Sequence, residues 1–177
     1  MEQRIYIIGM PGSGKSTVGK SLAKKLSWAF IDLDQMIALH EQMNIDTIFE
    51  QKGEAYFRRV EHTTLLQTKN LNKVVISCGG GTPAFENNMD WINKNGLSIY
   101  LNASVSLLES RIIQSKTVRP LFKNLEKEQI EKKITKLFDQ RKKYYCQAAL
   151  LITLPLKSVK SLAEQASAHF LNVDFKL

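Results

Sequence analysis

Residues 9–17 read GMPGSGKST, a stretch in which closely spaced glycines are followed by a lysine and two hydroxyl side chains. Backbone N–H groups can curl around a polyphosphate only where the residues lack a Cβ that would block the approach. In a loop of this kind Lys15 reaches the β- and γ-phosphates, and the Ser16 hydroxyl is a ligand of Mg²⁺. The pattern predicts a nucleotide site with these contacts: Gly12, Ser13, Gly14, Lys15, Ser16 and Thr17.

Two carboxylates, Asp32 and Asp34, follow the short apolar segment 28–31. Residues two apart in a strand point to the same side, and open α/β sheets bind ligands at the carboxyl ends of their strands. A cap on the following helix is the alternative role for Asp34. Strand 73–78 ends without the usual acidic residue, so Asp32 is the expected carboxylate near the metal.

Two further segments suggest a second ligand. Residues 79–81 are consecutive glycines after an apolar strand, which is costly in backbone entropy unless something approaches the main chain closely. Arg58 stands near the start of a predicted helix, where the alternatives are a substrate contact, which we favour, or an ion pair with Glu54 or Glu61.

Segment 115–124 is polar and basic. It is either a plain surface loop or a mobile lid in which Arg119 stabilises the transferring phosphoryl group.

The elements that must position these residues alternate along the chain. Apolar runs predict strands at 5–8, 28–31, 73–78, 97–101 and 150–153. Helices are predicted at 18–26, 44–52, 54–69, 85–93, 104–114, 126–147 and 158–171, followed by a frayed tail. Thr47 and Glu50 have the spacing of a capping box, and Gly53 should break the chain. The alternation indicates an α/β fold, a parallel sheet with helices on both faces.

Composition is that of an ordinary globular domain: 177 residues, 44% hydrophobic and 24% charged. We expect a reduced cytoplasmic protein, because Cys78 and Cys146 have no metal or redox spacing and the N-terminus leaves no space for a signal peptide. No apolar run is long enough for a membrane span. The net charge of +8 suits either a nucleic-acid surface or a pocket for small polyanions. We expect a monomer that binds small molecules, without nucleic-acid or membrane partners.

The whole chain resembles the shikimate kinases, a branch of the nucleoside-monophosphate-kinase-like P-loop family. The motifs that carry the resemblance are the loop at 9–17, Asp32-Leu33-Asp34, Gly53-Glu54 with Phe57-Arg58 and Glu61, Gly79-Gly80-Gly81, Arg119-Pro120-Leu121, and Arg141 with Tyr145. The resemblance implies one three-layer domain over 1–177, with sheet order 2-3-1-4-5, a substrate-binding segment at about 33–61 and a lid at about 115–125. The lid reads Arg-Pro-Leu-Phe, where the family commonly has an aliphatic residue last.

The same resemblance implies transfer of the γ-phosphoryl group of ATP to the 3-hydroxyl of shikimate, with Mg²⁺, on the pathway to chorismate and the aromatic amino acids. It assigns catalysis to Asp34, Lys15 and Arg119, with Asp34 either removing the hydroxyl proton or only orienting the hydroxyl. It assigns the metal to Ser16 and Asp32, and the adenine border to Arg111 and Pro155. For shikimate it implies contacts with Asp34, Phe49, Phe57, Arg58, Gly79, Gly80, Gly81 and Arg141.

Two other functions remain open at this point. Another small-molecule kinase of the same fold, such as a gluconate or nucleoside monophosphate kinase, would share the phosphate-binding loop but not the pairing of Asp34 with Arg58 and Arg141. A regulatory or nucleic-acid-associated ATPase would agree with the positive charge, and DNA or RNA should stimulate its ATP hydrolysis.

Overall fold

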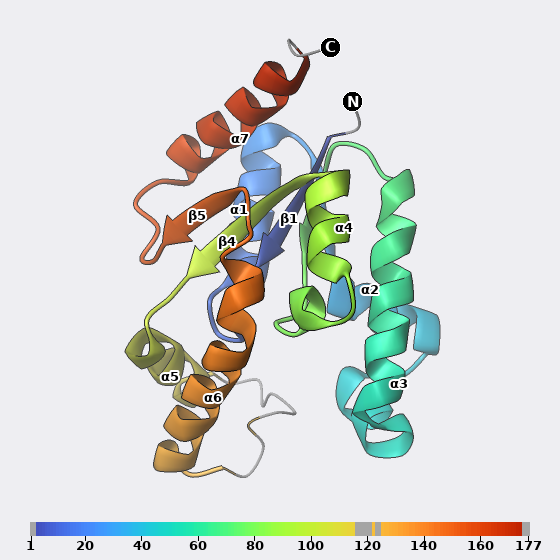
Figure 1. Cartoon of the computed structure of the whole chain (residues 1–177), viewed down its shortest axis with the longest axis vertical. Coiled ribbons are helices and arrows are strands. Elements are labelled where there is room, and N and C mark those ends of the chain that lie inside the picture. Colours follow the sequence, from blue (N-terminus) through green and yellow to red (C-terminus); the bar gives the residue numbers. More distant parts are fainter. Residues whose placement is uncertain (1–2, 116–121, 123–124, 175–177) are drawn as a thin grey trace.

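The computed structural model describes residues 3–115, 122 and 125–174. Its sheet contains β1 (Arg4–Ile8), β2 (Ala29–Asp32), β3 (Val74–Ser77), β4 (Leu97–Asn102) and β5 (Leu150–Thr153). All neighbouring strands are parallel, in the order β2-β3-β1-β4-β5 (Figure 1). The predicted fold class and strand order are therefore confirmed. Because the strands are parallel, their carboxyl ends all meet at one edge of the sheet.

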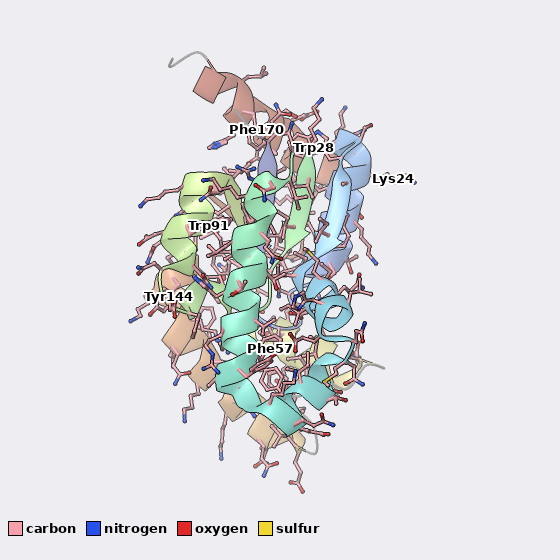
Figure 2. The ribbon with its side chains drawn as sticks, turned by 90° about the vertical axis from the view of Figure 1, so that its right-hand side faces the viewer. Lys24, Trp28, Phe57, Trp91, Tyr144 and Phe170 are labelled. Carbon is pink, nitrogen blue, oxygen red and sulfur yellow. The ribbon has the colours of Figure 1, made fainter. Side chains whose placement is uncertain are left out.

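Helices cover both faces of the sheet (Figure 1). They are α1 (Lys15–Leu26), α2 (Leu33–Glu41), α3 (Ile45–Gln67), α4 (Asn88–Asn95), α5 (Val105–Ile113), α6 (Lys127–Tyr145) and α7 (Val159–Asp174), with 3₁₀ turns η1 (Thr68–Asn70) and η2 (Thr82–Ala84). Figure 2 shows the layers from the side, with Lys24 of α1 and Trp91 of α4 on opposite sides of the sheet. No helix of the described ranges has the length and apolar character needed to cross a bilayer.

The two faces of β1 explain its uninterrupted apolar run. Ile5 and Ile7 belong to one buried cluster, which includes Leu22 of α1 and residues of α7. Tyr6 and Ile8 belong to the other, which includes residues of α3, α4 and α6. A strand buried on both faces cannot alternate apolar with polar residues, so the pattern at 5–8 follows from the position of β1 at the centre of the sheet.

Several local predictions differ from the structure. The helix expected at 85–93 begins at Asn88, because η2 precedes it and Phe85 is extended (φ −98°, ψ 128°). The capping box at Thr47 is wrong: Asn44 caps α3 and accepts a hydrogen bond from the Thr47 N–H at 2.8 Å. Gly53 does interrupt the helix as predicted (φ 78°, ψ 169°), although helical residues continue on both sides. Helix α7 extends to Asp174, into the segment expected to fray.

Candidate active site

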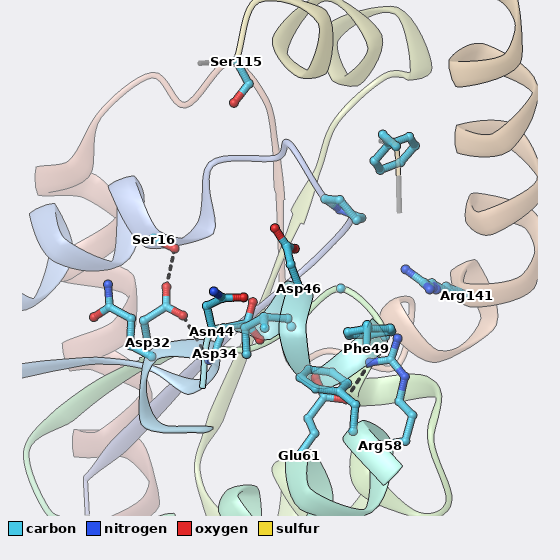
Figure 3. Close-up of a pocket in the computed structure, with 18 of the residues that line it drawn as sticks. Ser16, Asp32, Asp34, Asn44, Asp46, Phe49, Arg58, Glu61, Ser115 and Arg141 are labelled. Carbon is cyan, nitrogen blue, oxygen red and sulfur yellow. Dashed lines mark hydrogen bonds and ion pairs between the residues drawn. The ribbon is translucent and has the colours of Figure 1, made fainter. Parts of the chain in front are cut away.

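Two adjoining cavities open at the carboxyl edge of the sheet. The smaller, of about 130 Å³, lies over the glycine loop and is lined in part by Gly12, Gly14, Lys15, Ser16 and Thr17. The larger, of about 600 Å³, lies between α2, α3 and α6 (Figure 3). Both are lined by Ser16, Asp32, Asp34, Gly79 and Gly80. Because these residues form a shared boundary, a ligand in one cavity lies next to a ligand in the other.

The glycine loop has the backbone that its sequence predicts. Gly12 and Gly14 have φ of +86° and +89°, a region that other residues enter only with strain. Lys15 lies back along the loop, where its Nζ donates to the carbonyls of Gly9 and Met10, each at 3.0 Å. The buried Ser13 Oγ has no hydrogen-bond partner among the described residues. The loop therefore presents a cation, the Ser16 hydroxyl and the N-terminus of α1 to one small cavity, a set of groups that binds phosphate.

Ser16 and Asp32 are in direct contact. The Ser16 hydroxyl donates to Asp32 Oδ2 at 2.6 Å and lies 3.2 Å from Ser77 Oγ. Asp32 also caps α2, since its Oδ1 accepts the N–H of Asp34 at 3.2 Å. The cap is thus Asp32 and not Asp34, which leaves the Asp34 carboxylate to face the cavities.

Oxygen donors of this kind suit Mg²⁺, which retains several waters and needs few protein ligands. In the described ranges no group of three or more His, Cys, Asp or Glu side chains gathers as a metal site. Ser77 was missed by the sequence reasoning. The sequence shows only a polar residue near the end of a strand, and it is the register of β3 that brings Ser77 level with Asp32 on one side and Ile7 on the other.

Asp34 is the carboxylate best suited to proton transfer. Burial raises its pKa to about 6, and the nearby Glu61 and Asp32 contribute to the increase, while Lys15 and Arg58 oppose it. A general base works best when its pKa is close to the operating pH. Asp34 lines both cavities, so it lies where a hydroxyl group and a phosphate would meet.

Arg58 forms the ion pairs that were the alternative to a substrate contact, and its place still allows that contact. Its guanidinium pairs with Glu61 at 2.7 Å and with Glu54 at 3.0 Å, and it also lines the larger cavity. Burial acts to lower the pKa of Arg58, but the ion pairs with Glu61 and Glu54 favour the charged form and raise the pKa overall. Glu61 is fully buried and its other oxygen accepts the Thr82 hydroxyl at 2.5 Å. Glu61 therefore fixes Arg58 against the loop that follows β3, a role that the sequence did not reveal.

The glycine triplet is explained by close approach, as predicted, but the approaching groups are side chains of this chain. A Cβ at Gly80 would lie 2.8 Å from Pro11 Cδ, and a Cβ at Gly81 would lie 2.6 Å from Arg58 Cζ. A Cβ at Gly79 would overlap Glu61 Oε1. None of the three glycines has a left-handed φ, so space and not backbone conformation requires glycine here.

Aromatic rings and a second arginine complete the larger cavity. Phe49 and Phe57 pack with their ring centroids 4.6 Å apart. Arg141 of α6 is 7% exposed, and its Nη1 has no hydrogen-bond partner among the described residues. Figure 3 shows Arg58 and Arg141 reaching the cavity near Phe49 from separate helices. Two guanidinium groups beside aromatic rings are suited to a ring that carries a carboxylate.

Tyr145 connects α6 to both loops. Its hydroxyl donates to the Gly80 carbonyl and lies 3.7 Å from Met10 Sδ, and its ring stacks on Tyr100 at 5.1 Å. Burial raises the pKa of its hydroxyl, which stays protonated and able to donate. Arg141 lies one helical turn earlier, so this anchoring also positions the second guanidinium.

The two residues predicted to border the adenine lie outside these cavities. Arg111 lies beside the glycine loop, where its Nη1 donates to Ser13 O at 3.0 Å. Pro155 follows β5 after a cis peptide bond and is exposed. Neither lines the two cavities. Arg119 and most of the expected lid lie outside the described residues. Phe122 of this segment is described; it is buried and lines the larger cavity.

Comparisons with known proteins agree with this geometry. The family model described as shikimate kinase matches residues 11–174. A shikimate kinase from Azobacteroides pseudotrichonymphae genomovar. CFP2 is 37% identical, over 92% of this chain and 96% of its own length. The crystal structure of shikimate kinase from Bacteroides thetaiotaomicron has a TM-score of 0.86 and 31% identity, covering 97% of this chain and 99% of that one. That of shikimate kinase from Acinetobacter baumannii in complex with shikimate has a TM-score of 0.85 and 30% identity, covering 97% and 94%.

Proposed function

The chain belongs to the shikimate kinase family, and from this membership we propose how its two cavities perform the ATP-dependent phosphorylation of shikimate. ATP places its phosphates in the small cavity, over residues 12–17, with Arg111 and Pro155 toward the adenine. Shikimate occupies the larger cavity. The observation that carries the assignment is that Asp34, Gly79 and Gly80 form the boundary between a phosphate site and a cavity with two arginines.

Arg58 and Arg141 bind the shikimate carboxylate. A guanidinium offers paired donors in a fixed plane, which matches a carboxylate better than an ammonium group does. The buried Arg141 Nη1 without a partner in the described residues supports this, because an unsatisfied buried donor is unfavourable until a ligand accepts from it. Phe49 and Phe57 pack around the ring, and residues 79–81 lie beneath it.

Asp34 orients the 3-hydroxyl and accepts its proton as the oxygen attacks the γ-phosphorus. Lys15 and Arg119 neutralise the charge that spreads over the transferring group. Mg²⁺, held by Ser16 and Asp32, supplies further neutralisation of the β- and γ-phosphates when bound. Ser77, which is in register with Asp32, gives the Ser16 hydroxyl a second neighbouring oxygen at 3.2 Å. The contacts of Lys15 with the carbonyls of the loop must give way to phosphate.

The whole chain functions as a single domain and as a monomer in the cytoplasm, with segment 33–61 binding the acceptor and segment 115–125 acting as a lid. The single-domain proposal rests on the coverage of the family model, residues 11–174, and on the continuous cores on the two faces of the sheet.

A coupled ADP-release assay with Mg·ATP tests the function. The acceptors to compare are shikimate, gluconate, CMP and none, with duplex DNA or RNA added to the last. We expect turnover that depends on shikimate and on Mg²⁺. Turnover with gluconate or CMP instead would overturn the carboxylate-binding role of the arginines, and hydrolysis stimulated by nucleic acid would favour the ATPase alternative.

A further inference from the structure

Helix α3 bends in the middle of the segment that forms the larger cavity. Gly53 has φ 78° and ψ 169° inside an otherwise helical run, a conformation open almost only to glycine. A Cβ at Gly53 would meet nothing within 4 Å, so the glycine serves the backbone and not packing. The bend divides α3 into two arms: the arm before Gly53 carries Phe49, and the arm after it carries Phe57 and Arg58. The angle of the bend therefore sets how Phe49 faces the other two side chains.

A cluster of polar side chains holds both arms of this bend to α2. Glu41 is the last residue of α2, which packs beside α3 (Figure 1). One of its oxygens, Oε2, accepts from Lys52 Nζ at 2.7 Å and from the Tyr56 hydroxyl at 2.8 Å. Lys52 directly precedes Gly53 and Tyr56 follows it by three residues. A single carboxylate oxygen therefore connects the two arms across the bend.

The contacts within this cluster reinforce one another. Lys52 Nζ lies 3.3 Å from the Tyr56 hydroxyl and 4.6 Å from the centre of its ring. The Glu41 side chain is only 7% exposed, and the hydrogen bonds from Lys52 and Tyr56 lower its pKa to about 2. Isolated surface ion pairs contribute little because water screens them and the side chains are free to move. The Glu41 carboxylate is shielded from water and accepts from two donors in a fixed arrangement. It therefore restrains the position of α3 relative to α2 more than a typical surface ion pair would.

We propose that Glu41, Lys52 and Tyr56 form a clamp that fixes the bend at Gly53 and so positions Phe49 against Phe57 and Arg58 for shikimate binding. The three are positioning residues, because none of them lines either cavity. The inference rests on the proposed function, since it concerns affinity for shikimate.

The clamp should affect one substrate and not the other. The glycine loop, Asp32 and Ser77 belong to other elements and keep their own contacts when α3 shifts. Asp34 lies at the opposite end of α2, where the cap from Asp32 holds its backbone. Loss of the clamp therefore lowers the affinity of the larger cavity for shikimate and leaves the phosphate site and the Asp34 carboxylate in place.

The test is a steady-state comparison of the unmodified protein with Glu41→Gln and Tyr56→Phe. The matched control is Glu164→Gln, which removes the carboxylate of an exposed pair with Lys160 on α7 at 4.0 Å. We expect Glu41→Gln to raise the KM and the Kd for shikimate roughly threefold to tenfold, because the amide oxygen can still accept but no longer carries the charge that strengthens both hydrogen bonds. Tyr56→Phe should have a smaller effect of the same kind. The KM for ATP, kcat at saturating shikimate and all constants of the control should change less than about twofold.

Gly53→Ala gives a second, independent variant. Alanine cannot hold the observed φ and ψ without strain, and it has free space around its Cβ, so α3 should straighten without a clash. We expect the same selective increase in the shikimate KM, larger than for Glu41→Gln.

An unchanged shikimate KM in Glu41→Gln, with or without a lower melting temperature, would overturn the clamp and leave the function intact. Equal losses for both substrates, or a loss confined to kcat, would overturn it as well, because they would show that the cluster supports the whole fold or the reaction step. Absence of shikimate-dependent turnover in the unmodified protein would overturn the function and the clamp together.

Discussion

Replacing Asp34 by asparagine should make the free protein more stable while removing most of its activity. Burial, together with Glu61 and Asp32, raises the pKa of this carboxyl group from 3.8 to about 6. The folded protein therefore disfavours the ionised form that catalysis uses. Asparagine keeps the shape of the side chain but carries no charge, so it relieves the penalty.

The size of the effect follows from the pKa difference. A shift of about two units corresponds to about 3 kcal/mol when the group is fully ionised in both states. Between pH 3.8 and about 6 the folded state binds more protons than the unfolded state. The contribution of Asp34 to the free energy of unfolding therefore falls as pH rises, and the whole penalty is present above pH 6. At pH 5 roughly half of it is present.

Urea unfolding at pH 8 and pH 5, without ligands, measures this. The buried amide of asparagine also loses hydration, so we expect a gain of about 1–3 kcal/mol at pH 8 and about half of that at pH 5. The control is Asp139→Asn on the exposed side of α6, which should change stability by less than about 0.5 kcal/mol. The kcat of Asp34→Asn should fall roughly a hundredfold or more, the usual effect of losing a general base.

Two results would refute the reasoning. If Asp34→Asn is no more stable than the unmodified protein at pH 8, the ionised carboxylate is not disfavoured by its surroundings. If the gain is present but does not shrink at pH 5, it comes from packing or solvation of the amide and not from the proton equilibrium.

Arg58→Ala should raise the KM for shikimate about tenfold to a hundredfold and leave the KM for ATP unchanged, since a charge-assisted contact to the acceptor is lost; unaltered shikimate kinetics would contradict its contact with the carboxylate. Glu61→Gln removes the largest charge effect that raises the pKa of Asp34, so the acid limb of log kcat/KM, expected near pH 6 in the unmodified protein, should move to lower pH. An acid limb that stays in place would separate Glu61 from the titration. Gly81→Ala places a Cβ 2.6 Å from the Arg58 guanidinium and should raise the shikimate KM through displacement of that side chain, which a crystal structure of the variant would show.

Much of the fold could be predicted because its signals are local. The run at 5–8 is apolar on both sides because β1 is covered on both faces, and the loop at 9–17 is a contiguous pattern that needs no knowledge of the rest of the chain. Asp34 follows directly after a strand, so the carboxyl edge of a parallel sheet predicts its place. The positions of Arg58 and Arg141 on one cavity came only from the resemblance, since no spacing relates α3 to α6.

The parts that could not be predicted depend on several elements meeting. Glu61 has the helical spacing of a partner for Arg58, but its burial and its bond to Thr82 arise only when α3 packs against η2. Asp32 and Asp34 are each acceptable as a cap, and the choice between them depends on where α2 begins. Ser77 looks like any polar residue at the end of a strand until the register of β2 with β3 brings it level with Asp32.

For the glycine triplet, the sequence predicts that some group lies close to the backbone but does not determine which group it is. The sequence required close approach to residues 79–81, and a ligand was the natural candidate. The structure shows that Pro11 of the phosphate loop packs on Gly80 and that Arg58 packs on Gly81, while all three glycines also line the larger cavity. Both cavities are thus built against the same short piece of backbone. Because side chains at these positions would push the two walls apart, the glycines fix the separation between the phosphate site and the acceptor cavity, which is the distance that phosphoryl transfer depends on.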